Sequence, residues 1–527
     1  MKRLEYIYFP VIILFLSAAF LVFHPGCSIF PGKGDDSDIL LPDYWPTSGW
    51  RATYPEKQGM DSAYLADLLE TIQTQNYPIR CLLVIRNGYL VVEAYFHPFQ
   101  EGFWHVIHSC TKSITSSLIG IAIHQGYIAG EDRRVLDFFP EYSVENLDDR
   151  KESLTLRHLL MMASGLNTRD TAYYNWEGLT EMMASSDWAK YVLDLPMVAP
   201  PGTRFEYSNG VSYLLAAILQ KATNRPGLDY AHMNLFSHLG IPASHVDWPM
   251  SPQGVVIGWG RIRMRPVDMA KLGFLYLQKG KWDTRQLLPA DWIRKATQRQ
   301  ITTNTPIDGY GYQWWVTNQG YFTALGYAGQ YIIVHPEKNL VVVFTSAFAN
   351  QDLYFPGTLY EQYILDAARS NAPLPEDSQK QARLDNIIQE ISNPNPQPIP
   401  PLPETAAAIS GKTFYFETNS FDFKHISLTF TPGAEEAHLN FAFRDRNLQL
   451  PVGLDNLYRV TWQHSYWRAY KGMWENDTTF VLNYQIADWN ERGTMRMTFT
   501  GNMVHLVFRD DISEDQWEMI GYFEERR

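Results

Sequence analysis

The spacing of apolar residues predicts a hairpin followed by a buried helix early in the chain. Apolar and aromatic residues dominate 79–85 and 89–95, and Asn87-Gly88 between them is a strong two-residue turn sequence. Further on, the segment that begins at Ser109 carries an apolar run over 114–123. A helix with so little polar surface is expected to be buried on all sides.

The pattern changes in the last third of the chain. Residues 377–391 have helical spacing, with apolar residues at Leu384, Ile387, Ile388 and Ile391. A Pro-rich stretch, NPNPQPIPPLP, follows from position 393 and should be extended and fairly stiff. Beyond about residue 409 the period is two, with turn sequences such as Gly501-Asn502 between apolar runs. This pattern predicts an antiparallel barrel or sandwich of about 120 residues.

The N-terminus carries a membrane or secretion segment. Lys2 and Arg3 precede an apolar run over 6–23, which is long for a signal-peptide core and just long enough to span a bilayer. The positive end should stay cytoplasmic, which places the rest of the chain outside. Gly26-Cys27 resembles the end of a bacterial lipoprotein signal, so 1–27 is expected to be a signal peptide or a membrane anchor. Residues 28–54 are expected to form a tether.

Charge and cysteine content narrow the function classes. The 527-residue chain has a formal net charge of −13, which argues against a nucleic-acid partner. Its three cysteines, Cys27, Cys81 and Cys110, are too few for a disulfide scaffold. If Cys27 is processed or lipidated, Cys81 and Cys110 either pair or remain buried thiols. Aromatic residues make up 14% of the chain and could line a hydrophobic cleft, but core packing is the commoner use.

Ser109-Cys110-Thr111-Lys112 is the main candidate for catalysis. A Ser and a Lys three residues apart lie on one side of a helix, with Cβ atoms roughly 5–6 Å apart. Apolar neighbours disfavour the charged amine, so the pKa of Lys112 should fall from about 10.4 toward neutrality. A neutral amine beside a hydroxyl can activate a serine nucleophile. Roughly one or two such matches are expected by chance in a chain of this length, so the context must support the assignment.

The context resembles the serine β-lactamase and penicillin-binding-protein superfamily. The resemblance is to its class C-like branch, which includes esterases and 6-aminohexanoate-oligomer hydrolases, and it covers roughly 54–369. The matching segments, in the order of the family, are HSCTKSITSSLIGIAI from His108, LTLRHLLMMASGL from Leu154, PGTRFEYSNGVSYLLAAIL from Pro201 and LGYAGQYIIVHP from Leu325. The resemblance implies an α+β fold, in which helices flank an antiparallel sheet and a helical cluster lies between the two catalytic motifs.

The resemblance also assigns the second motif, Tyr207-Ser208-Asn209. This copy follows a Pro-Gly-Thr turn and precedes a helical run, as in the family, whereas Tyr173-Tyr174-Asn175 does not. Tyr207 would relay a proton between Ser109 and the leaving group. Asn209 would orient Lys112 or bind a substrate carbonyl. Without the resemblance, the tyrosine and asparagine would be interpreted as a packing residue and a helix cap.

The third motif departs from the penicillin-recognising pattern. Tyr327-Ala328-Gly329 stands where the family has Lys-Thr-Gly, and Gln330 follows. Gly329 allows close backbone approach, and the resemblance implies that the N–H groups of Ser109 and Gln330 form the oxyanion hole. Tyr327 and Gly329 would contact the substrate. The charged pair that binds a substrate carboxylate is missing, which favours esters or amides without that carboxylate over β-lactam or D-Ala-D-Ala substrates.

Other chemistries have weaker support. The chain has no Gly-x-Ser-x-Gly elbow, no His-Glu-x-x-His and no Cys-x-x-Cys. His105, His108 and Cys110 lack a second cluster that would complete a zinc site, so we expect no metal and no cofactor.

The sequence therefore predicts an extracytoplasmic serine hydrolase, membrane-anchored or a lipoprotein, located in the bacterial periplasm or at the cell surface. The expected domains are a signal peptide or anchor (1–27), a tether (28–54), a β-lactamase-like hydrolase domain (55–370), a helix with a Pro-rich linker (371–404) and a C-terminal β domain (405–527). Its expected partners are a small-molecule or peptide substrate and, through the N-terminal segment, a membrane. The alternatives are a catalytically idle module that senses cell-wall peptides or docks a partner, and a β-lactamase or D-Ala-D-Ala peptidase.

Overall fold

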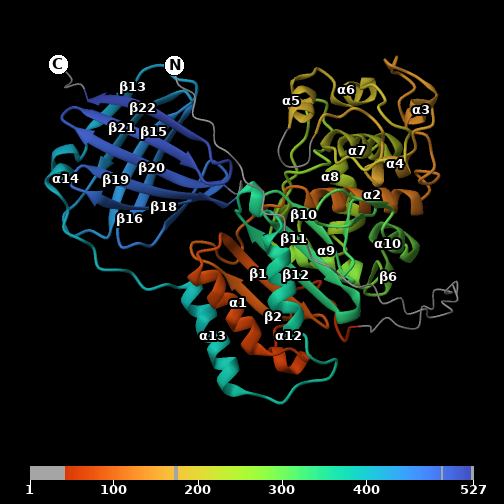
Figure 1. The fold of residues 1–527 in the computed structure, drawn as a ribbon, viewed down its shortest axis with the longest axis horizontal. Coiled ribbons are helices and arrows are strands. Elements are labelled where there is room, and N and C mark those ends of the chain that lie inside the picture. Colours follow the sequence, from red (N-terminus) through yellow and green to blue (C-terminus); the bar gives the residue numbers. More distant parts are fainter. Residues whose placement is uncertain (1–41, 171–175, 488–490, 524–527) are drawn as a thin grey trace, which may run out of the picture. The chain divides into compact units, whose positions relative to one another are not determined.

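An antiparallel sheet organises the larger part of the molecule (Figure 1). The computed structural model describes residues 42–170, 176–487 and 491–523. Within these residues, eight strands pair in the order β2-β1-β12-β11-β10-β9-β8-β7. Their bounds are β1 (Ile79–Arg86), β2 (Tyr89–Tyr95), β7 (Ile301–Thr302), β8 (Gly309–Tyr310), β9 (Trp315–Val316), β10 (Phe322–Gly326), β11 (Gln330–His335) and β12 (Leu340–Ser346). Two short strand pairs lie outside this sheet, β3 (His105–Val106) with β4 (Arg263–Met264) and β5 (Lys281–Trp282) with β6 (Arg285–Gln286).

The hairpin expected from the sequence is confirmed. Arg86 pairs with Tyr89 across the turn, and Asn87 and Gly88 both have positive φ, at 52° and 85°. Every residue of β1 is buried, because β2 and β12 flank its edges and helices cover both faces of the sheet. Such burial on both faces explains why its sequence is almost continuously apolar.

The helices along the chain have the following bounds. They are α1 (Ser62–Thr74), α2 (Cys110–His124), α3 (Asp149–Glu152), α4 (Leu156–Leu160), α5 (Glu177–Ala184), α6 (Trp188–Asp194), α7 (Asn209–Thr223), α8 (Gly227–Ala231), α9 (Pro266–Leu277), α10 (Ala290–Thr297), α11 (Phe355–Leu359), α12 (Leu365–Ala367), α13 (Ser378–Ser392) and α14 (Glu404–Ile409). Between α2 and α7 the described residues form helices and loops without a named strand, as the fold resemblance predicted.

Helices cover both faces of the sheet. A Cβ added to Gly273 of α9 would come within 2.9 Å of Ile332 on β11 and 2.6 Å of Val341 on β12. Tyr331, the neighbour of Ile332, points the other way, and its hydroxyl donates to the Leu353 carbonyl at 3.2 Å, just before α11. Successive residues of a strand face opposite sides, so α9 and α11 lie on opposite faces. The α+β fold predicted from the sequence is confirmed.

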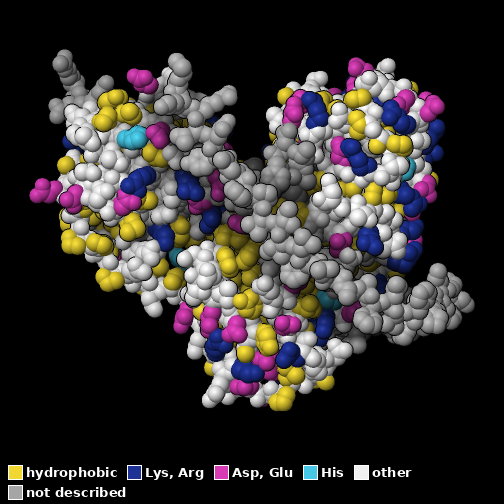
Figure 2. All heavy atoms as spheres, viewed as in Figure 1, with side chains coloured by type: hydrophobic (Ala, Val, Ile, Leu, Met, Phe, Trp, Pro, Cys, Tyr) yellow, Lys and Arg dark blue, Asp and Glu magenta, His cyan; other side chains and the backbone are white. Residues whose placement is uncertain are grey.

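The helix predicted over 377–391 is α13, and its apolar side joins the core of the sheet region. Leu384, Ile387 and Ile391 belong to the same hydrophobic cluster as β1 and α2. Figure 1 shows α13 beside α1, and the Arg383 guanidinium lies 2.6 Å from carboxylate oxygens of Asp67 and Glu70 on α1. Figure 2 shows acidic and basic side chains interspersed over this part of the surface.

The C-terminal strands close into a barrel. The strands β13 to β16 and β18 to β22 form a ring, because β16 also pairs with β18 at Gly453 and Lys471, and β17 extends it beside β18. The second hydrophobic cluster lines its interior. Between barrel and sandwich, which the sequence left open, the structure shows a barrel. The bounds are β13 (Thr413–Phe416), β14 (Phe423–Thr429), β15 (Glu436–Phe443), β16 (Arg446–Gly453), β17 (Arg459–Gln463), β18 (Tyr466–Asn476), β19 (Thr479–Ile486), β20 (Glu491–Thr500), β21 (Met503–Asp510) and β22 (Gln516–Phe523).

The predicted membrane segment over 6–23 and Cys27 lie outside the described residues. In the part of the chain that is described, none of the helices combines the length and the apolar character that a bilayer span requires. Cys81 and Cys110 are both buried and both free thiols.

Candidate active site

Ser109 lies at the start of α2, the helix that the sequence predicted to be fully buried. Every residue of α2 from Cys110 to Ala122 is buried, whereas Ser109 itself is partly exposed. The backbone of His108 has a φ of 44°, which turns the chain sharply just before the serine. The first turn closes through the Lys112 N–H, which donates to the Ser109 carbonyl at 3.0 Å. The serine hydroxyl thus lies at the partly exposed N-terminal end of a helix whose following residues are buried.

Three polar atoms surround the Lys112 amine. Its Nζ lies 2.8 Å from Asn209 Oδ1, 2.8 Å from the Trp259 carbonyl oxygen and 3.1 Å from Ser109 Oγ. The first two can only accept hydrogen bonds, while the serine hydroxyl can also donate. A neutral amine has two hydrogens and one lone pair. The two acceptors take the hydrogens, which leaves the lone pair for the Ser109 proton.

The surroundings of Lys112 favour this neutral form. The side chain is 1% exposed, and burial lowers its pKa well below the ordinary value. The negative charge of Asp170 acts in the opposite direction and limits the fall. The direction is the one expected from the apolar sequence around the lysine.

Tyr207 completes the group from another element. Its ring centroid lies 4.7 Å from Lys112 Nζ and stacks 5.7 Å from the ring of Trp315. Burial raises the pKa of its phenol, and a hydrogen bond with Ser109 partly offsets the rise. The phenol is therefore held protonated near the serine, in reach of a proton relay. The other Tyr-x-Asn, at 173–175, lies outside the described residues.

Asn209 is the first residue of α7, after the N-cap Ser208, whose hydroxyl accepts the Val211 N–H at 3.3 Å. Its Oδ1 accepts a hydrogen bond from Lys112. Of the two roles that the sequence allowed for Asn209, this contact supports the orientation of Lys112. Its Nδ2 is buried and has no hydrogen-bond partner among the described residues. That amide hydrogen is available to a substrate carbonyl, and substrate binding by Asn209 stays a prediction.

Asp170 is a site residue that the sequence analysis missed. It is 6% exposed and accepts the backbone N–H groups of Asn209 at 3.1 Å and Leu179 at 2.9 Å. Burial raises its pKa to about 6, although both N–H groups and Lys112 oppose the rise. Its only sequence signal is an acidic residue shortly after the LTLRHLLMMASGL segment.

Gln330 lies beside the nucleophile helix through its backbone. The Cys110 thiol donates to the Gln330 carbonyl at 3.4 Å, which brings the start of β11 against the first turn of α2. The Gln330 side chain is fully buried, and its Nε2 donates to the carbonyls of Tyr327 at 3.1 Å and Ser346 at 2.8 Å. The side chain therefore fixes the sheet edge, and the predicted oxyanion role belongs to the backbone N–H rather than to the side chain.

Gly326 is a second residue that the sequence analysis did not single out, although it stands in the quoted segment LGYAGQ. A Cβ at this position would lie 2.4 Å from the Ile107 carbonyl oxygen and 3.1 Å from the Ser109 nitrogen. The 2.4 Å contact is not tolerated, so the absence of a side chain lets β10 approach the nucleophile.

A groove of about 1130 Å³ borders the site. Its lining residues include the site residues Asp170 and Tyr207, together with Tyr354, Thr305 and Glu206. Polar and aromatic side chains thus line the groove beside Tyr207.

The comparisons with known proteins agree with this geometry. A family model described as Beta-lactamase matches residues 65–368, which is more than half of the chain. The chain belongs to the beta-lactamase family. The resemblance noted in the sequence is thereby confirmed.

Relatives within the beta-lactamase family include hydrolases. The chain is 21% identical over 308 residues to the 6-aminohexanoate-dimer hydrolase of Paenarthrobacter ureafaciens, covering 55% of this chain and 77% of the relative. A candidate 6-aminohexanoate-dimer hydrolase from Bacillus anthracis has a similar structure, with a TM-score of 0.50, 20% identity, and coverage of 64% of this chain and 89% of that one. The octameric penicillin-binding protein homologue from Pyrococcus abyssi aligns with a TM-score of 0.46 and 16% identity over 87% of this chain and 99% of its own.

This member of the beta-lactamase family carries an unusual third motif in the β10–β11 turn. Ala328 and Gly329 both have positive φ, at 58° and 84°. A Cβ on Gly329 would also come within 2.9 Å of Phe348, so glycine is required there by conformation and by space. The Tyr327 ring packs edge-on against His108, with centroids 5.3 Å apart. An aromatic ring thus stands where family members present a lysine, and contact of Tyr327 and Gly329 with substrate stays a prediction.

Proposed function

We propose that this protein is an extracytoplasmic serine hydrolase that cleaves an ester or amide substrate through an acyl-enzyme. Its beta-lactamase family membership and hydrolase relatives support hydrolysis. The observation that carries the serine mechanism is the environment of Lys112, whose Nζ lies 3.1 Å from Ser109 Oγ and is held by two further acceptors, the Asn209 side chain and the Trp259 carbonyl.

The proposed reaction begins when the Ser109 proton moves to Lys112 Nζ and Oγ attacks the substrate carbonyl carbon. The N–H groups of Ser109 and Gln330 hold the oxyanion, each contributing roughly 3 kcal/mol in the transition state. The bond to the leaving group then breaks, and Tyr207 donates its proton to that group and is reprotonated by the Lys112 ammonium. Water then attacks the acyl-serine and gives one proton to Lys112, the bond between the acyl carbon and Ser109 Oγ breaks, Lys112 passes that proton to Oγ, and the acid is released.

Active-site labelling tests this proposal. A fluorophosphonate probe should label the wild-type protein, while Ser109→Ala should abolish labelling and retain its circular dichroism spectrum. Ser117→Ala, a matched change in the same helix, should label normally, since its hydroxyl bonds only to Ser113 and Tyr276 among the described residues. A folded wild-type protein that resists the probe would favour the idle binding module instead.

The third motif sets the proposed substrate class. Tyr327-Ala328-Gly329 offers no cation to a substrate carboxylate. A missing charge-assisted hydrogen bond costs roughly 1.5–3 kcal/mol, or about ten- to 150-fold in kcat/KM. We expect p-nitrophenyl butyrate to be turned over more efficiently than a chromogenic cephalosporin. The 6-aminohexanoate dimer belongs in the panel because a relative is named for it. Preference for the cephalosporin would support the β-lactamase alternative.

The extracytoplasmic location is proposed from the sequence of 1–27 alone. Cell fractionation should find the protein outside the cytoplasm and with the membrane. Metabolic labelling with palmitate, lost in Cys27→Ala, would select the lipoprotein over the membrane anchor, whereas recovery from the cytoplasm would contradict both.

A further inference from the structure

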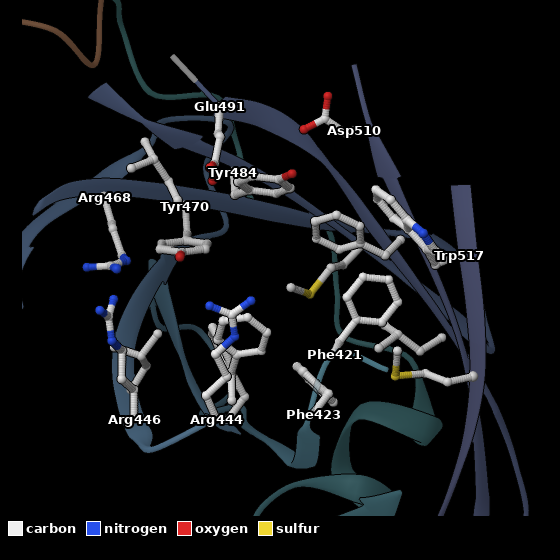
Figure 3. A pocket seen from close by; sticks show the side chains of 18 of the residues that line it. Phe421, Phe423, Arg444, Arg446, Arg468, Tyr470, Tyr484, Glu491, Asp510 and Trp517 are labelled. Carbon is white, nitrogen blue, oxygen red and sulfur yellow. The ribbon is translucent and has the colours of Figure 1, made fainter. Parts of the chain in front are cut away.

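The C-terminal barrel encloses a cavity of about 550 Å³ (Figure 3). This volume is within the range of pockets that hold one small molecule. The lining residues come from both strands and turns and are Phe421, Phe423, Phe441, Phe443, Arg444, Arg446, Leu448, Tyr466, Arg468, Tyr470, Tyr484, Ile486, Glu491, Met495, Leu506, Phe508, Asp510, Trp517 and Met519. None of them belongs to the Ser109 site.

All these residues lie toward one end of the barrel. They stand near the turns β13–β14, β15–β16, β17–β18, β19–β20 and β21–β22, which meet at the same end because neighbouring strands are antiparallel. Inward-facing positions here carry aromatic and aliphatic side chains. The rings of Phe423 and Phe441 stack 5.7 Å apart, and those of Tyr484 and Phe508 stack 5.4 Å apart. The cavity wall is therefore mostly apolar.

Three arginines gather on one side of this cavity. Figure 3 shows the guanidinium groups of Arg444, Arg446 and Arg468 close together, across from Phe421 and Trp517. Arg444 lies in the β15–β16 turn, Arg446 is the first residue of β16, and Arg468 stands near the start of β18. Arg468 is only 5% exposed, its Nη1 donates to the Gln463 carbonyl at 2.5 Å, and its guanidinium lies 5.2 Å from the Tyr466 ring centroid.

No carboxylate forms an ion pair with these arginines in the part of the chain that is described. Glu491 and Asp510 also line the cavity. Figure 3 shows Asp510 away from the arginines, while the charge of Arg468 acts on Glu491 and partly offsets the rise that burial causes in the pKa of this carboxyl. Asp510 Oδ1 is already occupied, because it accepts the N–H groups of Ile512 at 2.8 Å and Ser513 at 2.7 Å. Guanidinium groups pair strongly with carboxylates and phosphates, so this arginine cluster is suited to an anion.

We propose that the barrel cavity binds an amphipathic anion, a single acyl chain with a carboxylate head. The chain occupies the aromatic interior, and the carboxylate lies on Arg444, Arg446 and Arg468. Barrels of this size can hold one such ligand among inward-facing side chains. The site is independent of the Ser109 chemistry, and this assignment does not rest on the proposed hydrolase function.

Calorimetric titration of the full chain with dodecanoate, below its micelle concentration, tests the site. One equivalent should bind, and dodecanol, which has the same chain without the charge, should bind at least tenfold more weakly. Shortening the chain to decanoate should weaken binding by roughly threefold to fourfold per methylene. Absence of binding, or equal binding of dodecanol, would overturn the proposal. Binding to anionic phospholipid vesicles without binding of dodecanoate would also overturn it.

Variants locate the bound molecule. The double change Arg444→Gln and Arg446→Gln should weaken dodecanoate binding tenfold or more, with little effect on dodecanol. Arg509→Gln is a matched control, since Arg509 is exposed on β21 and does not line the cavity. Ser109→Ala should bind dodecanoate as the wild type does, and loss of binding in that variant would place the ligand in the hydrolase site and refute the barrel site. A folded arginine variant that binds normally would do the same.

Discussion

The Nζ atom of Lys112 lies 3.1 Å from the Oγ atom of Ser109, one helical turn away. Two features of the structure fix this distance. The helix sets the spacing of the two backbones, and Asn209 and the Trp259 carbonyl hold the amine from the far side. Because the part of α2 from Cys110 to Ala122 is buried and anchors both residues, little rearrangement is needed before proton transfer.

Lys112 and Tyr207 are expected to act as one proton-transfer unit. Lys112→Ala and Tyr207→Phe should each lower kcat by roughly 10²-fold or more, as the loss of a general acid–base residue does. The double variant should be little worse than the poorer single variant, because residues that act together are non-additive. Steady-state kinetics on p-nitrophenyl butyrate measure this.

The matched control is Lys271→Met, which removes another buried lysine, in α9, that is paired with Asp268 at 3.4 Å. Its kcat should be close to wild type even if its melting temperature falls. Fully multiplicative losses in the Lys112 and Tyr207 double variant would show that the two residues act independently.

The pH dependence should follow the protonation of Lys112. Only the neutral amine accepts the Ser109 proton, so kcat/KM should rise with pH as Lys112 loses its proton. The midpoint should lie below about 10.4, because burial lowers this pKa. The Asp170 carboxylate stabilises the ammonium and raises the pKa of Lys112. Asp170→Asn should therefore move the rising limb to lower pH.

Asp170→Asn also tests whether Asp170 is a positioning residue for the catalytic lysine. A merely structural role would lower the melting temperature and leave the midpoint of the pH profile in place. A midpoint that moves to higher pH would contradict the electrostatic assignment.

Gly326→Ala should remove activity without unfolding the sheet. The new Cβ would lie 2.4 Å from the Ile107 carbonyl oxygen, a distance that side chains do not adopt, and at a tight 3.1 Å from the Ser109 nitrogen, so the chain at the nucleophile must shift. A shift of about 1 Å at the reacting atom can cost roughly 10²-fold. Fluorophosphonate labelling rates report the change.

Gly260→Ala is the control for this prediction. Its Cβ would lie 3.7 Å from the nearest atom, the His108 carbonyl carbon, which is an ordinary contact. That variant should label at a near wild-type rate. Equal labelling of Gly326→Ala would mean that the chain beside Ser109 adjusts freely.

Gln330→Met should distinguish the structural role of the Gln330 side chain from the proposed oxyanion role of its backbone N–H. The side chain supplies hydrogen bonds to Tyr327 and to both backbone groups of Ser346, so its loss should lower the free energy of unfolding by roughly 1–3 kcal/mol. The backbone N–H is retained, so kcat should stay within a few-fold of wild type at a temperature where the variant is folded. A large fall in kcat with unchanged stability would assign the side chain to substrate or transition-state binding. Urea unfolding and steady-state kinetics make the comparison.

The sequence alone determined the features that depend on neighbours in the chain. The Asn87-Gly88 turn, the buried helix after Ser109 and helix α13 follow from turn chemistry and apolar period, which act over a few residues. The pairing of Ser109 with Lys112 could be predicted for the same reason, since the two residues are one helical turn apart.

The tertiary structure decided what depends on segments far apart in the sequence. Asp170, the Trp259 carbonyl and Gly326 reach the Ser109 site only through chain folding, and no local pattern marks a backbone carbonyl as a lysine acceptor. Barrel and sandwich share the same two-residue period, so only the pairing of β16 with β18 separates them. The arginine cluster in the barrel cavity has the same origin, because Arg446 and Arg468 belong to separate strands that ring closure brings together.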